Sequence, residues 1–431
     1  MSHRLVGIRL CWLACSILLV SSPVLRAENW PQWRGAKIDG ISQEKNLPTT
    51  FGPTEGVAWK VDLPGAAGST PAVWDDRIYL TSVDGDKLVL LCISTTGKEL
   101  WRQTMATGNK DVRGDEGNSA SPSPCTDGQH VWAFFANGTL GCYTKDGKEV
   151  WKIDVQDRYG KLSIAFGMTS TPVLDSGKLF LQLIHGEGDP KTREAVVVCL
   201  DGLTGKELWK HDRASDGKAE CEHSYASPIL YRDGKQAYLI SHGADYVTAH
   251  SLDDGHELWR CGDLNPKGNY NNTLRFVASP VAAEGIIVVP SAKNGPVYAL
   301  KPDGKGDVTD NDAAYLWKRD KETPDVPSPL IVDGLVYLCR ENGNLICMDA
   351  KTGEEYYNQR TTADRHRASP VYADGKIYLC ARKGVVTVVK AGKDFEILAK
   401  NDMVDTISSS PAISNGKIYL RTFKALYAVG K

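Results

Sequence analysis

Side chains that could bind a ligand or perform chemistry gather just ahead of a recurring Ser/Thr-Pro dipeptide. The segment "CEHSY" supplies Glu222, His223 and Tyr225, and the segment "RHR" supplies Arg365 and Arg367. Carboxylates and imidazoles transfer protons or hold metal ions, whereas guanidinium groups bind carboxylates or phosphates through paired hydrogen bonds. These segments predict a binding site to which separate parts of the chain contribute.

Polar groups occupy the same position ahead of the other Ser/Thr-Pro dipeptides, and Phe166 and Asp325 belong to these positions as well. If the positions meet, they form one rim that suits a small polar or anionic ligand. The alternative for the arginines is a solvated basic edge that binds nothing. The residues predicted to bind a cofactor or ligand are Glu116, Asn118, Glu222, His223, Tyr225, Asn272, Arg275, Arg365, Arg367 and Asp405.

Three histidines raise the question of a metal centre. His185, His223 and His242 lie in or beside loops expected on the same face, and imidazoles with a carboxylate suit zinc or another transition metal. Nearby acids are Glu187 and Asp189. The alternative is that these histidines are polar loop residues with ordinary hydrogen bonds, because loops from neighbouring units need not converge.

The elements that must position these groups are repeated. The Ser/Thr-Pro dipeptide opens eight copies of a unit, spaced 41 to 56 residues apart, in which runs such as "KLFL", "VVVCL" and "KELWK" alternate apolar and polar residues. Each unit therefore predicts four short strands, and eight four-stranded units predict an all-β, eight-bladed β-propeller. The copies are placed at Pro71, Pro122, Pro172, Pro228, Pro280, Pro329, Pro370 and Pro411.

A tryptophan ends most copies of the unit, usually four residues after a glycine. A large flat ring at one repeated position can dock between neighbouring blades while its N–H reaches a backbone carbonyl. Tyr357 and Leu398 replace the tryptophan in two copies. The predicted docking residues are Trp59, Trp101, Trp151, Trp209, Trp259 and Trp317.

The two ends of the chain predict how the ring closes. The last copy, residues 408–431, stops after three strands, and the segment "GVAWKVDLP" near residues 56–63 is a fourth strand without a unit of its own. Pairing the two would complete the eighth blade and remove an exposed sheet edge.

Residues 1–27 predict a secretory signal peptide, with two arginines, an apolar run over residues 10–20 and a cut after Ala27. The alternatives are an uncleaved anchor and lipidation at Cys15. The propeller is then expected to span residues 28–431, periplasmic or secreted, without a transmembrane span and as a monomer. The net charge of −2 gives no basic surface for nucleic acid.

Eleven cysteines are spread over the chain, several of them inside apolar strand-like runs, as at Cys92, Cys199 and Cys347. Such cysteines are expected to be free, buried hydrophobic residues. Cys221 and Cys261, which flank one repeat, are the best candidates for a disulfide.

The phrase "TGKELW", with "SPxxxDGxIYL" ahead of it, resembles the tryptophan-docking repeat of the PQQ-binding-like propellers. That family includes the quinoprotein dehydrogenases and the outer membrane assembly factor BamB. The resemblance covers nearly all of residues 28–431 and implies the propeller fold. Its quinoprotein members bind PQQ above the propeller axis with a cation such as calcium, a catalytic aspartate and often a disulfide between adjacent cysteines.

The chain contains no adjacent cysteines and no haem-attachment motif. We therefore expect a non-enzymatic binding or scaffold protein of the cell envelope, with a protein partner or a small ligand at the loop face. One alternative is a quinoprotein-type oxidoreductase that uses PQQ and calcium. The other is a propeller that binds a small ligand or a metal in its central funnel.

Overall fold

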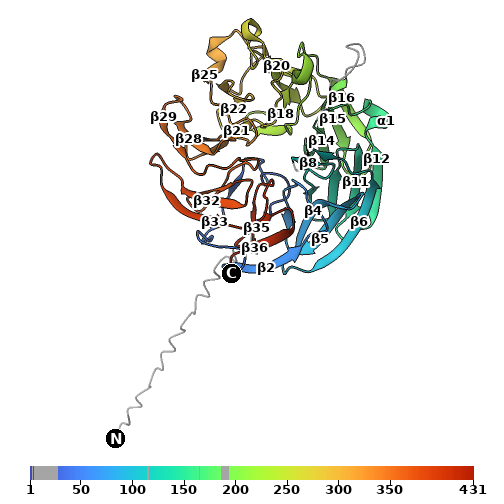
Figure 1. The fold of residues 1–431 in the computed structure, drawn as a ribbon, viewed down its shortest axis with the longest axis vertical. Coiled ribbons are helices and arrows are strands. Elements are labelled where there is room, and N and C mark those ends of the chain that lie inside the picture. Colours follow the sequence, from blue (N-terminus) through green and yellow to red (C-terminus); the bar gives the residue numbers. More distant parts are fainter. Residues whose placement is uncertain (2, 4–27, 114–115, 165, 186–193) are drawn as a thin grey trace.

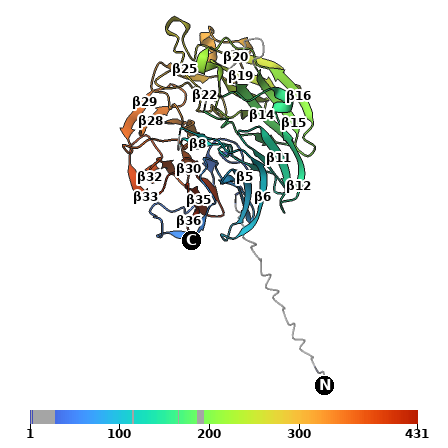
Figure 2. The ribbon, with the colours of Figure 1, turned by 45° about the vertical axis from the view of Figure 1, so that its right-hand side comes forward.

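Eight antiparallel sheets surround a central axis in the computed structural model, which describes residues 1, 3, 28–113, 116–164, 166–185 and 194–431. Figure 1 looks down this axis, and Figure 2 shows the same ring after a turn of 45°. The eight-bladed propeller is therefore confirmed. The predicted signal peptide and Cys15 lie outside the described residues, of which only Met1 and His3 precede Glu28.

The first four blades follow one another along the chain. Blade one contains β3 (Ala72–Trp74), β4 (Arg77–Asp84), β5 (Lys87–Ser94) and β6 (Glu99–Thr107), and blade two contains β9 (Cys125–Thr126), β10 (His130–Phe134), β11 (Thr139–Thr144) and β12 (Glu149–Asp154). Blade three contains β13 (Val173–Asp175), β14 (Lys178–His185), β15 (Glu194–Asp201) and β16 (Glu207–Asp212). Blade four contains β17 (Ile229–Arg232), β18 (Ala237–Gly243), β19 (Tyr246–Ser251) and β20 (Glu257–Cys261).

The next three blades repeat the order. Blade five contains β21 (Val281–Ala283), β22 (Ile286–Pro290), β23 (Val297–Leu300) and β25 (Tyr315–Arg319). Blade six contains β26 (Leu330–Val332), β27 (Leu335–Cys339), β28 (Asn344–Asp349) and β29 (Glu355–Arg360). Blade seven contains β30 (Val371–Ala373), β31 (Lys376–Cys380), β32 (Val385–Lys390) and β33 (Ile397–Asp402). Short additions pair parallel to blades seven and four, namely β1 (Ile41–Ser42) on β30 and β24 (Gly306–Asp307) on β20.

The remaining elements lie in the connections between strands. They are the hairpin β7 (Asp111–Val112) with β8 (Gly117–Asn118), the helix α1 (Gln156–Tyr159), and three 3-10 turns at Ala219–Glu222, Lys267–Asn269 and Asp312–Ala314. No helix in the described part of the chain is long and apolar enough to cross a membrane.

The eighth blade joins the two ends of the propeller. It contains β34 (Ala412–Ser414), β35 (Lys417–Arg421) and β36 (Ala425–Val429), and its outer strand is β2 (Val57–Asp62). Strand β2 runs antiparallel to β36, with Val57 opposite Val429 and Asp62 opposite Ala425. Ring closure by an N-terminal strand is confirmed, and both edges of the chain of blades are paired.

Tryptophans dock most of the blades onto the next. The Trp101 indole donates to the carbonyl of Lys145 at 2.8 Å, and a Cβ added to Gly147, whose φ is +85°, would lie 2.8 Å from the Trp101 ring. Only glycine leaves room for this contact. The same pattern pairs Trp59 with Gly97, Trp151 with Gly205, Trp209 with Gly255 and Trp317 with Gly353.

The Ser/Thr-Pro dipeptides form a ring of hydrogen bonds around the axis. The backbone N–H of Thr70 donates to the Ser123 hydroxyl at 2.9 Å, and the N–H of Ser123 donates to the Thr171 hydroxyl at 3.1 Å. Equivalent bonds of 2.8–3.0 Å continue through Ser227, Ser279, Ser328 and Ser369 to Ser410.

One repeat position predicted from the sequence was wrong. The second copy was placed at Pro122, but the ring residue of that blade is Ser123, ahead of Pro124. The cause is the doubled motif "SPSP". Only Ser123 leads directly into β9, whereas Ser121 donates from its hydroxyl to the carbonyl of Asn118 at 2.7 Å in the preceding turn.

The N-terminal segment crosses the axis at the opposite end of the inner strands. Trp30 bridges to β3 of blade one, Gln32 bonds to blade three, and Gly40 accepts from β30 of blade seven. Arg34, which is fully buried, donates to the carbonyl of Pro329 in blade six at 2.7 Å. The segment therefore ties together blades on opposite sides of the ring.

All nine cysteines from Cys92 onward are free and buried, so the disulfide predicted between Cys221 and Cys261 was wrong. The two residues lie in different apolar clusters. The Cys221 thiol donates to the carbonyl of Asn271 at 3.1 Å, and the Cys261 sulfur lies 3.2 Å from the Tyr315 hydroxyl. The expectation of buried free cysteines is confirmed.

We predict that Trp101→Ala destabilises the propeller by about 3 kcal/mol, because the change removes both the ring that covers Gly147 and the bond to Lys145. Urea unfolding of the whole chain would measure the loss. The matched control is Leu100→Ala, since Leu100 is the neighbouring side chain and is 40% exposed. Equal losses in the two variants would contradict the docking role.

Candidate functional site

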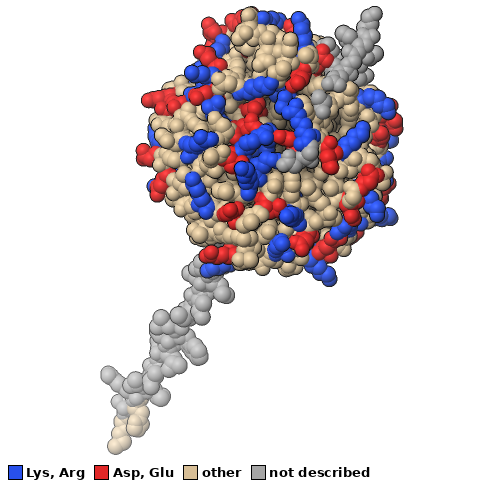
Figure 3. All heavy atoms as spheres, viewed as in Figure 1, with Lys and Arg blue, Asp and Glu red and all other residues tan. Residues whose placement is uncertain are grey.

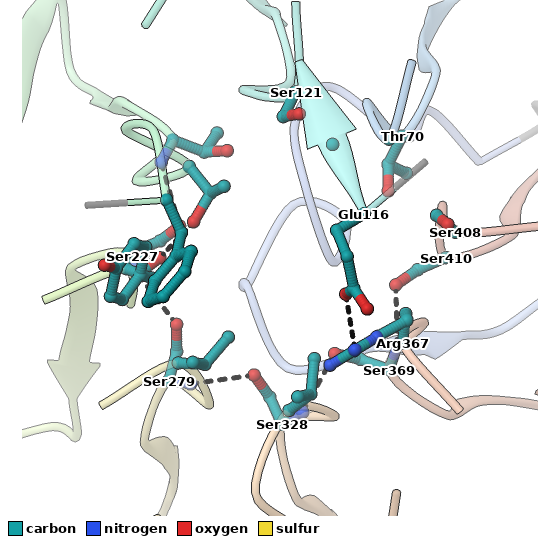
Figure 4. A pocket seen from close by; sticks show the side chains of 18 of the residues that line it. Thr70, Glu116, Ser121, Ser227, Ser279, Ser328, Arg367, Ser369, Ser408 and Ser410 are labelled. Carbon is teal, nitrogen blue, oxygen red and sulfur yellow. Dashed lines mark hydrogen bonds and ion pairs between the residues drawn. The ribbon is translucent and has the colours of Figure 1, made fainter. Parts of the chain in front are cut away.

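A cavity of about 280 Å³ lies on the axis, on the face where the chain enters the inner strands. Its lining includes the Ser and Thr hydroxyls of the repeated dipeptides (Figure 4). Trp33 from the N-terminal segment lines it as well. Its rim carries charged and aromatic groups, and Figure 3 shows Arg, Lys, Asp and Glu side chains gathered at the centre of this face. The rim residues are Arg113, Glu116, Phe166, Tyr225, Arg275, Asp325, Glu341, Arg365 and Arg367.

Two acids and two arginines form one network across the cavity. Arg365 lies 3.2 Å from a Glu116 oxygen and 2.7 Å from a Glu341 oxygen, and Arg367 lies 3.2 Å from the same Glu341 oxygen. Arg367 also pairs with Glu116 (Figure 4). The Arg367 side chain is only 16% exposed, whereas that of Arg365 is 51% exposed. The Arg367 contacts are therefore less screened by solvent and hold the network in place.

Phe166 lies between two guanidinium groups on the other side of the cavity. The Arg113 guanidinium is 4.1 Å from the centre of the Phe166 ring, and that of Arg275 is 4.5 Å from it. Arg275 also pairs with Glu220 at 3.0 Å. Arg113 forms no ion pair with the acids that the structure describes. Its charge is therefore available to a ligand.

Asp325 differs from the other two cavity acids because no described arginine forms an ion pair with it. One carboxylate oxygen accepts the backbone N–H of Lys293 at 2.7 Å. Burial raises the pKa of Asp325, and the neighbouring Glu341 carboxylate raises it further, against the opposing effect of the Lys293 bond. This carboxyl group is suited to accept and hold a proton.

The structure brings half of the predicted binding set together. Glu116, Tyr225, Arg275, Arg365 and Arg367 line the cavity, whereas the other five residues do not. Their interactions are structural where they are known: Asn118 donates to Ala66 at 2.6 Å, Asp405 accepts the N–H groups of Thr406 and Lys424, and the carbonyl of Asn272 accepts the N–H of Glu220. Glu222 and His223 lie beside the cavity rather than in its lining.

Three charged or aromatic lining residues were missed by the sequence analysis, namely Trp33, Arg113 and Glu341. Glu341 lies in the turn between β27 and β28, and loops between second and third strands were already expected on this face. Arg113 lies three positions before Glu116, so the same segment carried the signal. The sequence contains no signal for Trp33, because nothing in the repeat indicates where the N-terminal segment runs.

The three predicted metal ligands are buried. Burial lowers the pKa of His185 to about 4, with a contribution from His223, and lowers that of His242 to about 3, with a contribution from Arg213. His242 packs edge-on against Phe276 at 5.0 Å. Across the residues that the structure describes, no group of three or more His, Cys, Asp and Glu could hold a metal ion. Glu187 and Asp189 lie outside the residues that the structure describes. The described residues therefore give no support to the predicted metal site of His185, His223 and His242.

Comparison with known proteins identifies the repeat. A family model described as "Outer membrane protein assembly factor BamB" matches residues 50–188, 86–307 and 304–394. The structure of BamB from Moraxella catarrhalis superposes with a TM-score of 0.60 at 12% identity, covering 87% of this chain and 97% of that one. A quinohemoprotein alcohol dehydrogenase from Comamonas testosteroni gives a TM-score of 0.67 at 13% identity, covering 94% and 81%. At these identities both structures support the fold alone.

Curated relatives are named as enzymes. A polyvinylalcohol dehydrogenase from a Pseudomonas species is 27% identical over 352 residues, which cover 68% of this chain and 51% of that protein. A second protein of that name, from Sphingopyxis, is 26% identical over 322 residues, covering 70% of this chain and 43% of that protein. This chain therefore spans about half the length of the curated relatives it matches.

These relatives contradict the expectation of a non-enzymatic envelope scaffold. That expectation rested on two absent motifs, adjacent cysteines and a haem attachment site. Neither absence bears on the arginines and carboxyl groups that line the cavity. The oxidoreductase alternative is better supported.

We predict that the free energy of unfolding falls as the pH is lowered from about 6.5 toward about 4. Buried His185 and His242 remain neutral in the folded protein, so the unfolded chain binds more protons below the ordinary histidine pKa of about 6.5. The contribution is fully present above that pH and disappears as the pH falls. Urea midpoints at about pH 7.5 and about pH 4.5 would measure it.

The variant His242→Phe keeps a ring against Phe276 and should remove about 2 kcal/mol of the difference between the two pH values. The control is His256→Phe, since the side chain of His256 is 59% exposed. An unchanged pH dependence in His242→Phe would contradict the assignment.

Proposed function

This chain belongs to the family of PQQ-like propellers whose model is described as the outer membrane protein assembly factor BamB, and from that premise we propose that it is a quinoprotein-type oxidoreductase. The observation that carries the proposal is the cavity on the axis, in which four arginines and three carboxyl groups surround about 280 Å³. We propose alcohols as the substrate class, because the curated relatives are named polyvinylalcohol dehydrogenases.

The cavity lining fits an anionic, planar cofactor such as PQQ, whose ring system carries carboxylates. Arginines outnumber acids in the lining, so an anion would neutralise an excess of positive charge. Arg113 and Arg275 would bind the carboxylates, since guanidinium groups match them geometrically. Tyr225 places a second aromatic ring beside Phe166, with ring centres 6.1 Å apart. The cofactor, when bound, supplies a two-electron acceptor.

A calcium ion fits this lining less well. Calcium takes six to eight oxygen ligands, several of them from carboxylates. Glu116 and Glu341 are already paired with Arg365 and Arg367, and the described residues offer no cluster of three metal-ligating side chains. The proposed function therefore assigns no step to a metal.

Asp325 is the proposed proton acceptor. Oxidation of an alcohol requires removal of the hydroxyl proton, and a general base must lie in the cavity to take it. Asp325 lines the cavity without an arginine partner among the described residues, and its pKa is raised by burial. Glu116 and Glu341 serve to hold Arg365 and Arg367 in place.

We also propose that the chain is exported and cut near Ala27. The apolar run over residues 10–20 supports export. The backbone nitrogen of Glu28 donates to a Glu44 carboxylate oxygen at 3.0 Å. A cut after Ala27 would turn that nitrogen into a cationic amino group beside an acid. Intact mass measurement of the exported protein would give the cleavage site, and a mature chain that starts elsewhere would contradict the proposal.

We predict that PQQ binds with one-to-one stoichiometry in calorimetric titration, and that Arg275→Gln weakens binding by about tenfold or more. The matched control is Arg102→Gln, because Arg102 pairs with Glu99 and Asp84 on an outer strand away from the cavity. Absence of any binding heat would overturn the cofactor assignment.

We predict that Asp325→Asn lowers kcat for alcohol oxidation by about a hundredfold or more while PQQ affinity is retained. A soluble dye serves as the electron acceptor in this assay. The control Asp333→Asn changes an acid that also has a positive φ but lies in the β26–β27 turn, outside the cavity. Equal rates in wild type and Asp325→Asn would exclude the proposed base.

A further inference from the structure

A second cavity, of about 410 Å³, adjoins the first. It lies between the hairpin of β7 and β8 and the residues Leu162, Ile164, Phe166 and Gly167, which come between α1 and blade three in the sequence. Val112, Arg113 and Phe166 line both cavities. The two cavities are therefore separated by no more than these side chains, at the point where the Arg113 guanidinium stacks on the Phe166 ring.

The second cavity has an apolar wall. Leu162, Ile164 and Phe166 occupy every second position of one segment, and Val112 and Ala136 complete the wall. Leu162 and Ile164 are only partly buried, although they pack against the core shared by blades two and three. Their exposed surface would be removed from water by an apolar ligand.

The amide side chains in this lining are already bonded within the protein. The Gln156 amide donates to the carbonyl of Asn137 at 2.9 Å, and its oxygen accepts the N–H of Leu162 at 3.1 Å. The Asn118 amide donates to Ala66 at 2.6 Å. A sugar or a peptide would need such groups for its own hydrogen bonds, whereas a hydrocarbon chain would not. Three charged side chains belong to this lining. Lys110 and Asp111 have opposite signs, and Arg113 stacks on Phe166 at the border with the central cavity.

We propose that the second cavity binds the hydrocarbon chain of an alcohol whose reacting hydroxyl lies in the central cavity. This inference rests on the proposed function and adds a specificity subsite to it. Arg113 and Phe166 stand where the chain would pass from one cavity to the other. Long-chain alcohols would then be preferred over short ones, because each methylene placed on the apolar wall adds to the affinity.

The test is the binding of linear primary alcohols from butanol to decanol, measured by calorimetry on the whole chain. Wild type should bind up to about fourfold more tightly for each added methylene. Ile164 lines the second cavity but not the central one. The variant Ile164→Trp, which fills part of the second cavity, should therefore remove the dependence of affinity on chain length and leave the binding of butanol unchanged. Ala136→Leu is a smaller filling change at a second position of the wall.

The matched control is Val150→Trp, since Val150 is 43% exposed on β12 and lies outside both cavities. Thermal unfolding of each variant shows that it is folded. A wild type without chain-length dependence, or filled variants that retain it, would overturn the proposal.

The outcome is separable from that of the proposed function. Chain-length-dependent binding that Ile164→Trp abolishes, without oxidation of any alcohol, would support the subsite and refute the oxidoreductase. Oxidation that is equally efficient for all chain lengths, with no dependence in binding, would refute the subsite alone.

Discussion

Hydrogen bonds between successive Ser/Thr-Pro dipeptides are the interaction on which the rest of this structure depends. From Thr70 to Ser369, the backbone N–H of each residue donates to a hydroxyl of the next blade, so the eight inner strands start at one level around the axis. A proline follows each of these residues and has no N–H of its own to compete. Because the rim segments end at this ring, their side chains are delivered directly above it.

Two features make the ring rigid. They are the docking of tryptophans at the outer strands and the N-terminal segment that crosses the axis at the far end of the inner strands. Trp101 and its equivalents fasten most of the blades to a glycine of the next, and buried Arg34 fastens the N-terminal segment across the axis. A charged site benefits from such a frame, because arginines that are held apart from acids keep their electrostatic effect on a ligand. Arg113 meets this condition, since it forms no ion pair with the acids that the structure describes, whereas Arg367 is mostly buried and contacts acids from two other parts of the ring.

Fold and function separate in this family. BamB and a quinohemoprotein alcohol dehydrogenase superpose on the chain at similar low identity, so the propeller by itself does not choose between a scaffold and an enzyme. The cavity distinguishes them better. It holds an excess of arginines, the carboxyl group of Asp325 without an arginine partner among the described residues, and an apolar extension beside Phe166.

The sequence by itself determined the eight blades, the tryptophan docking and the closing strand, because each depends on a local pattern that recurs at a regular interval. It also placed Glu116, Arg275 and Arg367 at the rim, since they precede the same dipeptide. Only the tertiary structure decided which groups meet. Glu116 and Arg367 are 251 positions apart and come together because the ring closes. The side chains of Asn118 and Asp405 bond to backbone groups instead. Side-chain direction within a loop depends on neighbouring chain segments, which no local pattern contains.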